Sequence, residues 1–178
     1  MPRPADDGAC DHLVGLAMPP VHLASTSGRE VDVGALGKGR TVIYCYPRTG
    51  VPGENLPDGW DAIPGARGCT PQACAFRDHA AELAALDASL FGLSTQSTAY
   101  QRELAERLHL PFEVLSDADF ELTNALRLPT FAANGMRLIK RLTLVVQDDR
   151  IEHVFYPVFP PDENASTVIG WLRDHPAP

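Results

Sequence analysis

Two cysteines, Cys69 and Cys74, stand five residues apart in a stretch that has the features of a helix start. The stretch is Gly68-Cys69-Thr70-Pro71-Gln72-Ala73-Cys74-Ala75-Phe76-Arg77-Asp78. Threonine is a favoured N-cap and proline is favoured at the first helical position, so Thr70 and Pro71 mark the start of a helix. Apolar residues continue at mostly three- and four-residue steps. We therefore predict a helix from Thr70 to about Ala88.

The spacing of the two cysteines restricts how they can react with one another. On a regular helix, residues five positions apart lie about 140° apart around the axis, with Cα atoms about 8.7 Å apart. A disulfide needs Cα atoms no more than about 7 Å apart. A bond between Cys69 and Cys74 therefore requires part of the first helical turns to unwind. We expect a reduced, folded state and an oxidised, locally unfolded state.

The position of Cys69 at the start of the helix favours its thiolate. Unpaired backbone N–H groups and the helix dipole stabilise a negative charge there, whereas Cys74 lies more than a turn further on. A thiolate that attacks a peroxide becomes a sulfenic acid, which condenses with a nearby thiol to a disulfide. We therefore expect Cys69 to attack and Cys74 to capture its oxidised form. The spacing does not match thioredoxin-type redox pairs, and no further cysteine or histidine pair completes a zinc site.

Strands and helices alternate on both sides of this helix. Thr41–Tyr46 is β-branched, aromatic and almost wholly apolar, which is typical of a strand buried on both faces of a sheet, and Cys45 within it is expected to pack in the core. Further along the chain we predict a strand over 90–94, a helix over 98–108, a short strand over 111–115, a helix over 120–126, paired strands over 142–146 and 151–155, and a helix over 165–173. This order predicts an α/β chain with a thioredoxin-like fold, in which a mixed central sheet carries helices on both faces.

Two segments depart from this regular order. Residues 48–67 are rich in glycine and proline and form an inserted loop before the cysteine helix, and about twenty residues is long for a loop, which favours a functional or covering role. We expect Trp60 to attach this loop to the body of the protein. Arg48 and Arg67 flank the loop and are expected to be solvated charges. Residues 1–11 are expected to be flexible, with Cys10 a bystander.

Composition limits the class of protein. With 178 residues, of which 44% are hydrophobic and 21% charged, the chain is predicted to form one domain over residues 1–178. No apolar run approaches the roughly 20 residues that span a bilayer, and the polar start lacks the apolar stretch of a secretory signal. A net charge of -8 disfavours nucleic acid and anionic membranes as partners. Four cysteines without an export signal favour the cytoplasm. No metal, flavin or nucleotide cofactor is indicated.

The cysteine stretch resembles the active-site segment of peroxiredoxins of the Q type, also called bacterioferritin comigratory proteins. Similarity extends to the segments Gly15–Leu23, Ser116-Asp117, Leu126–Pro129, Lys140–Val145 and Ile151–Val154. The resemblance covers nearly the whole chain apart from the extreme N-terminus and the 48–67 loop. It implies a thioredoxin-like fold and an atypical 2-Cys thiol peroxidase that reduces hydrogen peroxide or organic hydroperoxides, is recycled by thioredoxin or a similar dithiol donor, and is a monomer or small homodimer.

The resemblance also implies a role for individual residues. Cys69 matches the peroxidatic cysteine and Cys74 the resolving cysteine, which implies a disulfide between them. Arg141 matches the strand arginine that orients the substrate and stabilises the thiolate, as a fixed cation near a thiolate or a developing oxyanion should. Gln72 matches the residue that holds this arginine.

The chain departs from the family pattern at one place. The family's proline and threonine, seven and three residues before the peroxidatic cysteine, are replaced by Ala62 and Ala66. Because Tyr46-Pro47-Arg48-Thr49-Gly50 follows the central strand, the 48–67 loop is interpreted as an insertion within the motif. Pro47 and Thr49 are therefore candidate site residues, if the loop folds back to return Thr49 to the site. Thr70 is the alternative source of the hydroxyl.

Two other functional classes remain open from the sequence. A redox sensor or thiol-disulfide exchange protein would use the same disulfide with slow peroxide turnover, and the displaced threonine keeps this alternative open. A catalytically silent binding scaffold is the third class. The intact pair of Cys69 and Cys74 argues against it.

Overall fold

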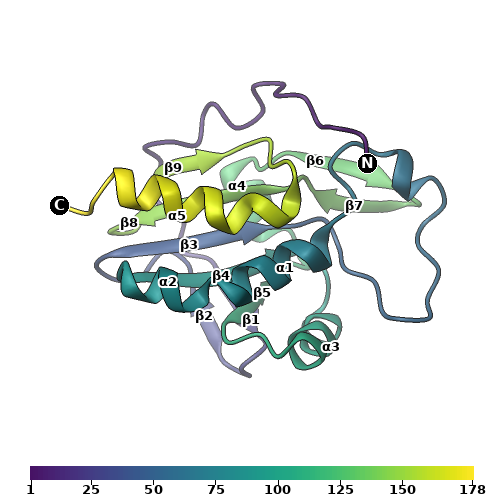
Figure 1. Cartoon of the computed structure of the whole chain (residues 1–178), viewed down its shortest axis with the longest axis horizontal. Coiled ribbons are helices and arrows are strands. Elements are labelled where there is room, and N and C mark those ends of the chain that lie inside the picture. The colour runs from purple at the N-terminus through teal and green to yellow at the C-terminus, as the bar shows by residue number, and fades with distance from the viewer.

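Strand β3 (Arg40–Cys45) lies inside a seven-stranded sheet in the computed structural model, which describes residues 1–178 (Figure 1). It pairs parallel with β4 (Ala88–Ser94) and antiparallel with β8 (Leu142–Gln147). The other strands are β1 (His22–Ser25), β2 (Glu30–Asp32), β5 (Glu113–Ser116) and β9 (Arg150–Phe155), and the sheet order is β2-β1-β5-β4-β3-β8-β9. The prediction of a mixed sheet is confirmed, including the antiparallel pairing of β8 with β9.

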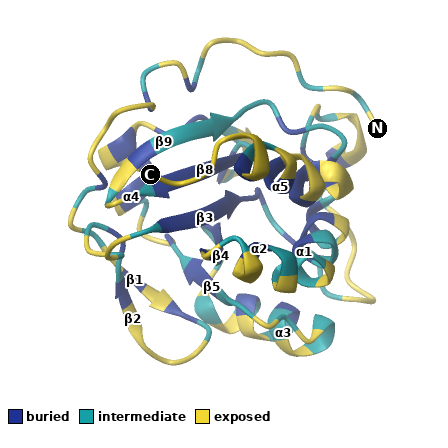
Figure 2. Cartoon of the chain, turned by 60° about the vertical axis from the view of Figure 1, so that its left-hand side comes forward, coloured by how far each residue is buried: buried dark blue, intermediate teal, exposed yellow.

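All six residues of β3 are buried, and their side chains alternate between two layers of core. Val42 and Tyr44 face the first layer, which is covered by α1 (Cys69–Asp78), α2 (Ala80–Ala85), α3 (Thr98–Leu108) and α5 (Asn164–Asp174). Ile43 and Cys45 face the second, which is covered by α4 (Glu121–Leu126) and residues 10–18. Helices therefore cover both faces of the sheet, with their exposed sides outward (Figure 2). None of them has the length and hydrophobicity that a membrane-spanning segment needs.

The helix predicted from Thr70 to Ala88 differs from the structure at both ends. It begins at Cys69, with Gly68 as the N-cap, so Thr70 lies inside the helix and does not cap it. Gly68 has a φ of 105°, and a Cβ there would lie 2.6 Å from Cγ of Pro161, so a glycine is needed for both conformation and space. The helix breaks at His79, which separates α1 from α2.

A hairpin that the sequence analysis missed forms a second, two-stranded sheet. Its strands are β6 (Thr130–Ala133) and β7 (Met136–Ile139), joined at Asn134 and Gly135 with φ of 48° and 73°. An Asn-Gly pair is the characteristic sequence of a two-residue hairpin turn in which both central residues have positive φ. The signal was therefore present in the sequence.

The 48–67 loop is attached to this hairpin. Trp60 is buried, and its ring lies 6.1 Å from the ring of Phe131 between centroids. Ala66 and Leu138 complete the same small hydrophobic cluster. The expected role of Trp60 is confirmed, and the loop is held where its last residues, directly before α1, approach β7.

The N-terminal segment also makes specific contacts. Asp7 accepts hydrogen bonds from Lys140 and from the hydroxyl of Tyr156, both at 2.8 Å. Cys10 was expected to be a bystander in a flexible segment, but it is only 6% exposed and packs in the second core layer, which also contains Cys45. Burial raises the pKa of the Cys10 thiol to about 12, so this cysteine stays protonated at neutral pH.

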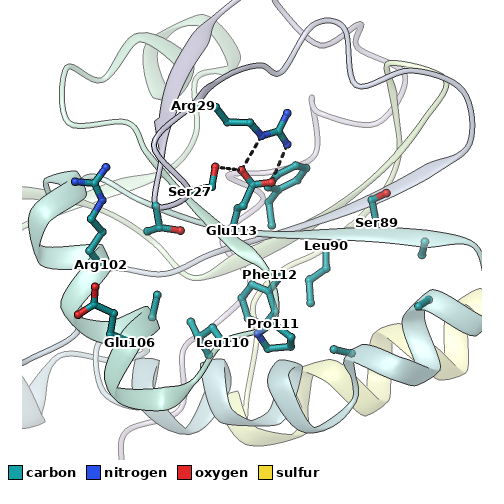
Figure 3. Close-up of a pocket in the computed structure, with 16 residues that line it drawn as sticks. Ser27, Arg29, Ser89, Leu90, Arg102, Glu106, Leu110, Pro111, Phe112 and Glu113 are labelled. Atoms are coloured by element: carbon teal, nitrogen blue, oxygen red, sulfur yellow. Dashed lines mark hydrogen bonds and ion pairs between the residues drawn. The ribbon is translucent and has the colours of Figure 1, made fainter.

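Glu113 connects β5 to the turn between β1 and β2. Its carboxylate accepts two hydrogen bonds from Arg29, at 2.7 and 2.8 Å, and one each from Ser25 and Ser27, both at 2.6 Å (Figure 3). The bonds from Arg29 are the largest cause that lowers the pKa of Glu113 from 4.5 to about 2. A carboxyl whose pKa is lower in the folded state stabilises the fold above the unfolded pKa and loses this contribution as the pH falls.

We predict that Glu113→Gln lowers the free energy of unfolding at pH 7 by about 1 kcal/mol, since a partly exposed network is screened by solvent. The difference from the wild type should shrink as the pH falls from 4.5 toward 2, where the native carboxylate becomes protonated. Urea unfolding of both proteins at the two ends of this pH range measures the difference in the free energy of unfolding. Glu106→Gln, at an exposed carboxyl without an ion pair, is the control. A difference that stays constant with pH would contradict the prediction.

Candidate active site

Cys69 is the first residue of α1, where its sulfur meets the dipole and the unpaired N–H groups of the helix start. The side chain is buried, with 4% of the residue exposed. Its Sγ lies 3.1 Å from Nη2 of Arg141 and 3.7 Å from the carbonyl oxygen of Ala66, to which the thiol donates. A guanidinium at this distance stabilises the thiolate, because it supplies both a positive charge and a hydrogen-bond donor.

Arg141 lies directly before β8 and is 3% exposed. Its Nη1 donates to Oε1 of Gln72, and its Nη2 also faces the carbonyls of residues 65, 66 and 67 at 3.2 to 3.3 Å. It forms no ion pair with a carboxylate, unlike the buried Arg40, which pairs with Glu152. Burying an unpaired charge is unfavourable. Among the groups that accept hydrogen bonds from Arg141, only the thiol of Cys69 can become an anion.

A chain of buried polar groups positions the arginine. Gln72, three residues after Cys69 on α1, donates from Nε2 to Oδ1 of Asn164 at 2.9 Å. The same oxygen accepts from the hydroxyl of Thr143 at 2.7 Å. The chain therefore links α1 with α5 and β8. Gln72 was predicted from the sequence, whereas Asn164 and Thr143 were not, although Thr143 is the one polar residue in the run Leu142–Val146.

Thr49 bonds to Gln96 with all of its polar groups. Its N–H and its hydroxyl donate to Oε1 of Gln96 at 2.9 and 3.3 Å, and its carbonyl accepts from Nε2 of Gln96 at 3.0 Å. It makes no hydrogen bond with Cys69, and neither does Thr70. In this structure Gln96 therefore satisfies all polar groups of Thr49, and the hydroxyl of Thr49 does not bond to the sulfur. The carbonyl of Ala66 lies near the sulfur instead, while Pro47 is buried at the end of β3.

Cys74 lies on the same helix and is partly buried, and both cysteines are free thiols. The helix is regular between them, as expected for the reduced state. Phe76 fixes this part of α1 to the sheet, since its ring stacks on Tyr44 with centroids 4.4 Å apart. A disulfide would require Cys69 to leave its contacts with Arg141 and Ala66.

A cavity of about 320 Å³ borders Arg141. Its walls are residues 4–7 of the N-terminal segment, residues 63–65 of the inserted loop, and residues 156–158 after β9. A larger hollow of about 770 Å³ lies elsewhere, at the first residues of β4 and β5 (Figure 3). Neither hollow is lined by a cysteine, but the smaller one is lined by Arg141, whose guanidinium contacts Sγ of Cys69, so it is the one beside the cysteine site.

Comparison with known proteins agrees with this geometry. The family model described as Redoxin matches residues 13–169. Peroxiredoxin Bcp of Escherichia coli is 27% identical over 161 residues, which cover 88% of this chain and 93% of the relative. A putative peroxiredoxin of Mycobacterium tuberculosis is 30% identical over 139 residues, covering 78% of this chain and 80% of the relative.

Solved structures show the same architecture. The crystal structure of peroxidoxin BcpB from Mycobacterium tuberculosis matches with a TM-score of 0.74 at 26% identity, covering 93% of this chain and all of the other. A mutant of PrxQ from Xylella fastidiosa matches with a TM-score of 0.75 at 18% identity, covering 92% and 98%. The fold is thioredoxin-like, and the chain belongs to the redoxin family as a Q-type peroxiredoxin.

Proposed function

We propose that this peroxiredoxin reduces hydrogen peroxide or organic hydroperoxides with Cys69 as the peroxidatic cysteine and Cys74 as the resolving cysteine. The observation that carries the proposal is the buried guanidinium of Arg141, 3.1 Å from Sγ of Cys69 and without a carboxylate partner. A preorganised cation is most effective where water is excluded, because it needs no reorganisation when charge develops.

In the first step, the thiolate of Cys69 attacks one oxygen of the peroxide. An S–O bond forms, the O–O bond breaks, and the leaving oxygen takes up a proton as water or an alcohol. Nη2 of Arg141 is placed to stabilise both the attacking sulfur and the negative charge that develops on the oxygens. Gln72 acts as a positioning residue, since it holds Nη1 of Arg141 through its side-chain oxygen.

In the second step, the thiol of Cys74 attacks the sulfenic sulfur of Cys69. An S–S bond forms and water leaves. Because residues five apart on a helix have Cα atoms about 8.7 Å apart, the first turn of α1 must unwind. The resulting disulfide is reduced by thioredoxin or a similar dithiol, which makes the protein an atypical 2-Cys peroxidase that acts as a monomer or homodimer.

One observation favours a second candidate, a redox sensor with slow peroxide turnover. No side-chain hydroxyl forms a hydrogen bond with Sγ of Cys69, since Ala66 occupies the position three residues earlier and Thr49 is bonded to Gln96. The site therefore relies on Arg141 and on backbone groups to hold the peroxide. The measured rate of Cys69 oxidation separates the two candidates.

The roles of the two cysteines are tested by Cys69→Ser and Cys74→Ser. We expect Cys69→Ser to lower peroxide consumption to the uncatalysed background, because no other activated sulfur is present at the site. Cys74→Ser should keep the first oxidation but lose turnover, with a sulfenic acid that dimedone traps. Stopped-flow peroxide consumption with a thioredoxin system, together with mass spectrometry, measures both. Peroxide turnover that survives Cys69→Ser would rule out the assignment.

The role of Gln72 is tested by a matched pair of variants. Gln72→Leu leaves Nη1 of Arg141 without its acceptor, so we expect the rate of Cys69 oxidation to fall about tenfold. Gln72→Glu retains the acceptor oxygen and should keep most of the rate. Equal rates in both variants and the wild type would refute the positioning role.

The position of Thr49 predicts a small effect of its hydroxyl. Thr49→Val removes one hydrogen bond to Gln96 and no contact with the sulfur, so we expect the oxidation rate to stay within about twofold of the wild type. The comparison variant is Ala66→Gly, which changes the residue whose carbonyl lies near the sulfur. A loss of more than about tenfold in Thr49→Val would show that the loop rearranges and brings this hydroxyl to Cys69 during the reaction.

A further inference from the structure

A third hollow, of about 450 Å³, lies outside the cysteine site and takes no part in the proposed mechanism. Its lining includes Arg48, at the start of the inserted loop, and Arg137, on β7. Phe120, Met136 and Leu138 supply apolar surface. This combination of an apolar floor with a few charged groups, at this volume, is typical of small-molecule sites.

Neither of the two guanidinium groups pairs with a carboxylate, a property that five others of the chain's thirteen arginines share outside this hollow. Six other arginines form ion pairs with an acidic side chain: Arg29, Arg40, Arg67, Arg77, Arg107 and Arg173. The chain has 23 acidic residues against 15 basic ones, so acidic partners are abundant. Two cations that face one hollow without an acidic partner therefore leave a local positive charge on an acidic protein.

Arg48 has N–H groups that are free to donate further hydrogen bonds. Nη1 lies 3.5 Å from the sulfur of Met136 and Nη2 lies 3.4 Å from the hydroxyl of Tyr100, both long and to neutral acceptors. The acidic group that the network brings closest is Glu54, which accepts a 2.6 Å hydrogen bond from the same hydroxyl. Glu54 forms no ion pair with Arg48, so it does not occupy the guanidinium.

The contacts of Arg137 are similar. It donates to the side-chain oxygens of Asn124 at 3.0 Å and Thr130 at 3.4 Å, and its guanidinium lies 4.8 Å above the ring of Phe120. Stacking on an aromatic ring fixes the plane of the guanidinium while its edge stays available to an acceptor. An arginine edge presents two parallel N–H groups, which match the two oxygens of a carboxylate.

We propose that this hollow binds a small amphipathic carboxylate. The carboxylate accepts hydrogen bonds from Arg48 and Arg137, and the hydrocarbon part packs on Phe120, Met136 and Leu138. The site is distinct from the one around Cys69, since the residues that line the hollow do not include any that line the cavity beside Arg141. The proposal does not depend on the peroxidase function, because it rests on the arrangement of the hollow alone.

The test uses hexanoate as the probe and the reduced full-length protein with ¹³C-methyl methionine. The chain has three methionines, of which Met136 lines the hollow and Met18 lies in the core as an internal control. We expect hexanoate to shift the Met136 methyl resonance saturably and to leave that of Met18 unchanged. Binding should weaken at least tenfold, about 1.4 kcal/mol, in Arg48→Gln and in Arg137→Gln.

Arg102→Gln is the matched control, because Arg102 is exposed, forms no ion pair, and lines the separate hollow of Figure 3. It should bind hexanoate as the wild type does. Arg137 is exposed on β7, so its replacement should leave the fold intact, which a thermal melt verifies. Equal binding by all variants, or no shift of Met136, would overturn the proposal. An equal response to 1-hexanol would refute the role of the arginines, and tighter binding of inorganic phosphate would refute that of the apolar floor.

Discussion

The arrangement around the cysteine depends on one buried positive charge, the guanidinium of Arg141. A charge in a protein interior is unfavourable unless every donor finds an acceptor. Three consecutive carbonyls, of residues 65 to 67, together with Gln72 and Cys69, supply most of those acceptors. The end of the inserted loop and the start of α1 are thereby held around β8. The missing element is a counter-ion, the role that we propose for the thiolate of Cys69.

The inserted loop decides which polar groups surround the sulfur of Cys69. Its last residues, next to α1, place the carbonyl of Ala66 beside the sulfur, while its first residues leave Thr49 bonded to Gln96. Trp60, buried against the hairpin of β6 and β7, holds the middle of the loop. The loop therefore separates two polar segments of the chain. The segment that contains Ala66 lies at the reactive sulfur, and the segment that contains Thr49 borders the hollow that contains Arg48.

Most of the site could be predicted from sequence because its members lie in regular, strongly patterned elements. Cys69 and Cys74 follow from helical spacing and from resemblance to a family motif, and Gln72 and Arg141 follow from that resemblance. The partners of Gln72 could not be predicted, since Asn164 and Thr143 come from elements far away in the chain. The helix start was misplaced by one residue because Gly68 caps it through its left-handed conformation and the close approach of Pro161.

By itself, the sequence determined the buried central strand, the cysteine helix, the pairing of the last two strands, and the need for local unwinding before a disulfide between Cys69 and Cys74 can form. These properties follow from the spacing of residue types along the chain. Only the tertiary structure decided that Thr49 pairs with Gln96, that Cys10 is buried, and that Arg141 is held by the loop carbonyls. Each of these outcomes depends on which distant group bonds to a buried polar atom or fills the core. Several groups of the chain are able to do so, and the packing of the whole chain decides which of them does.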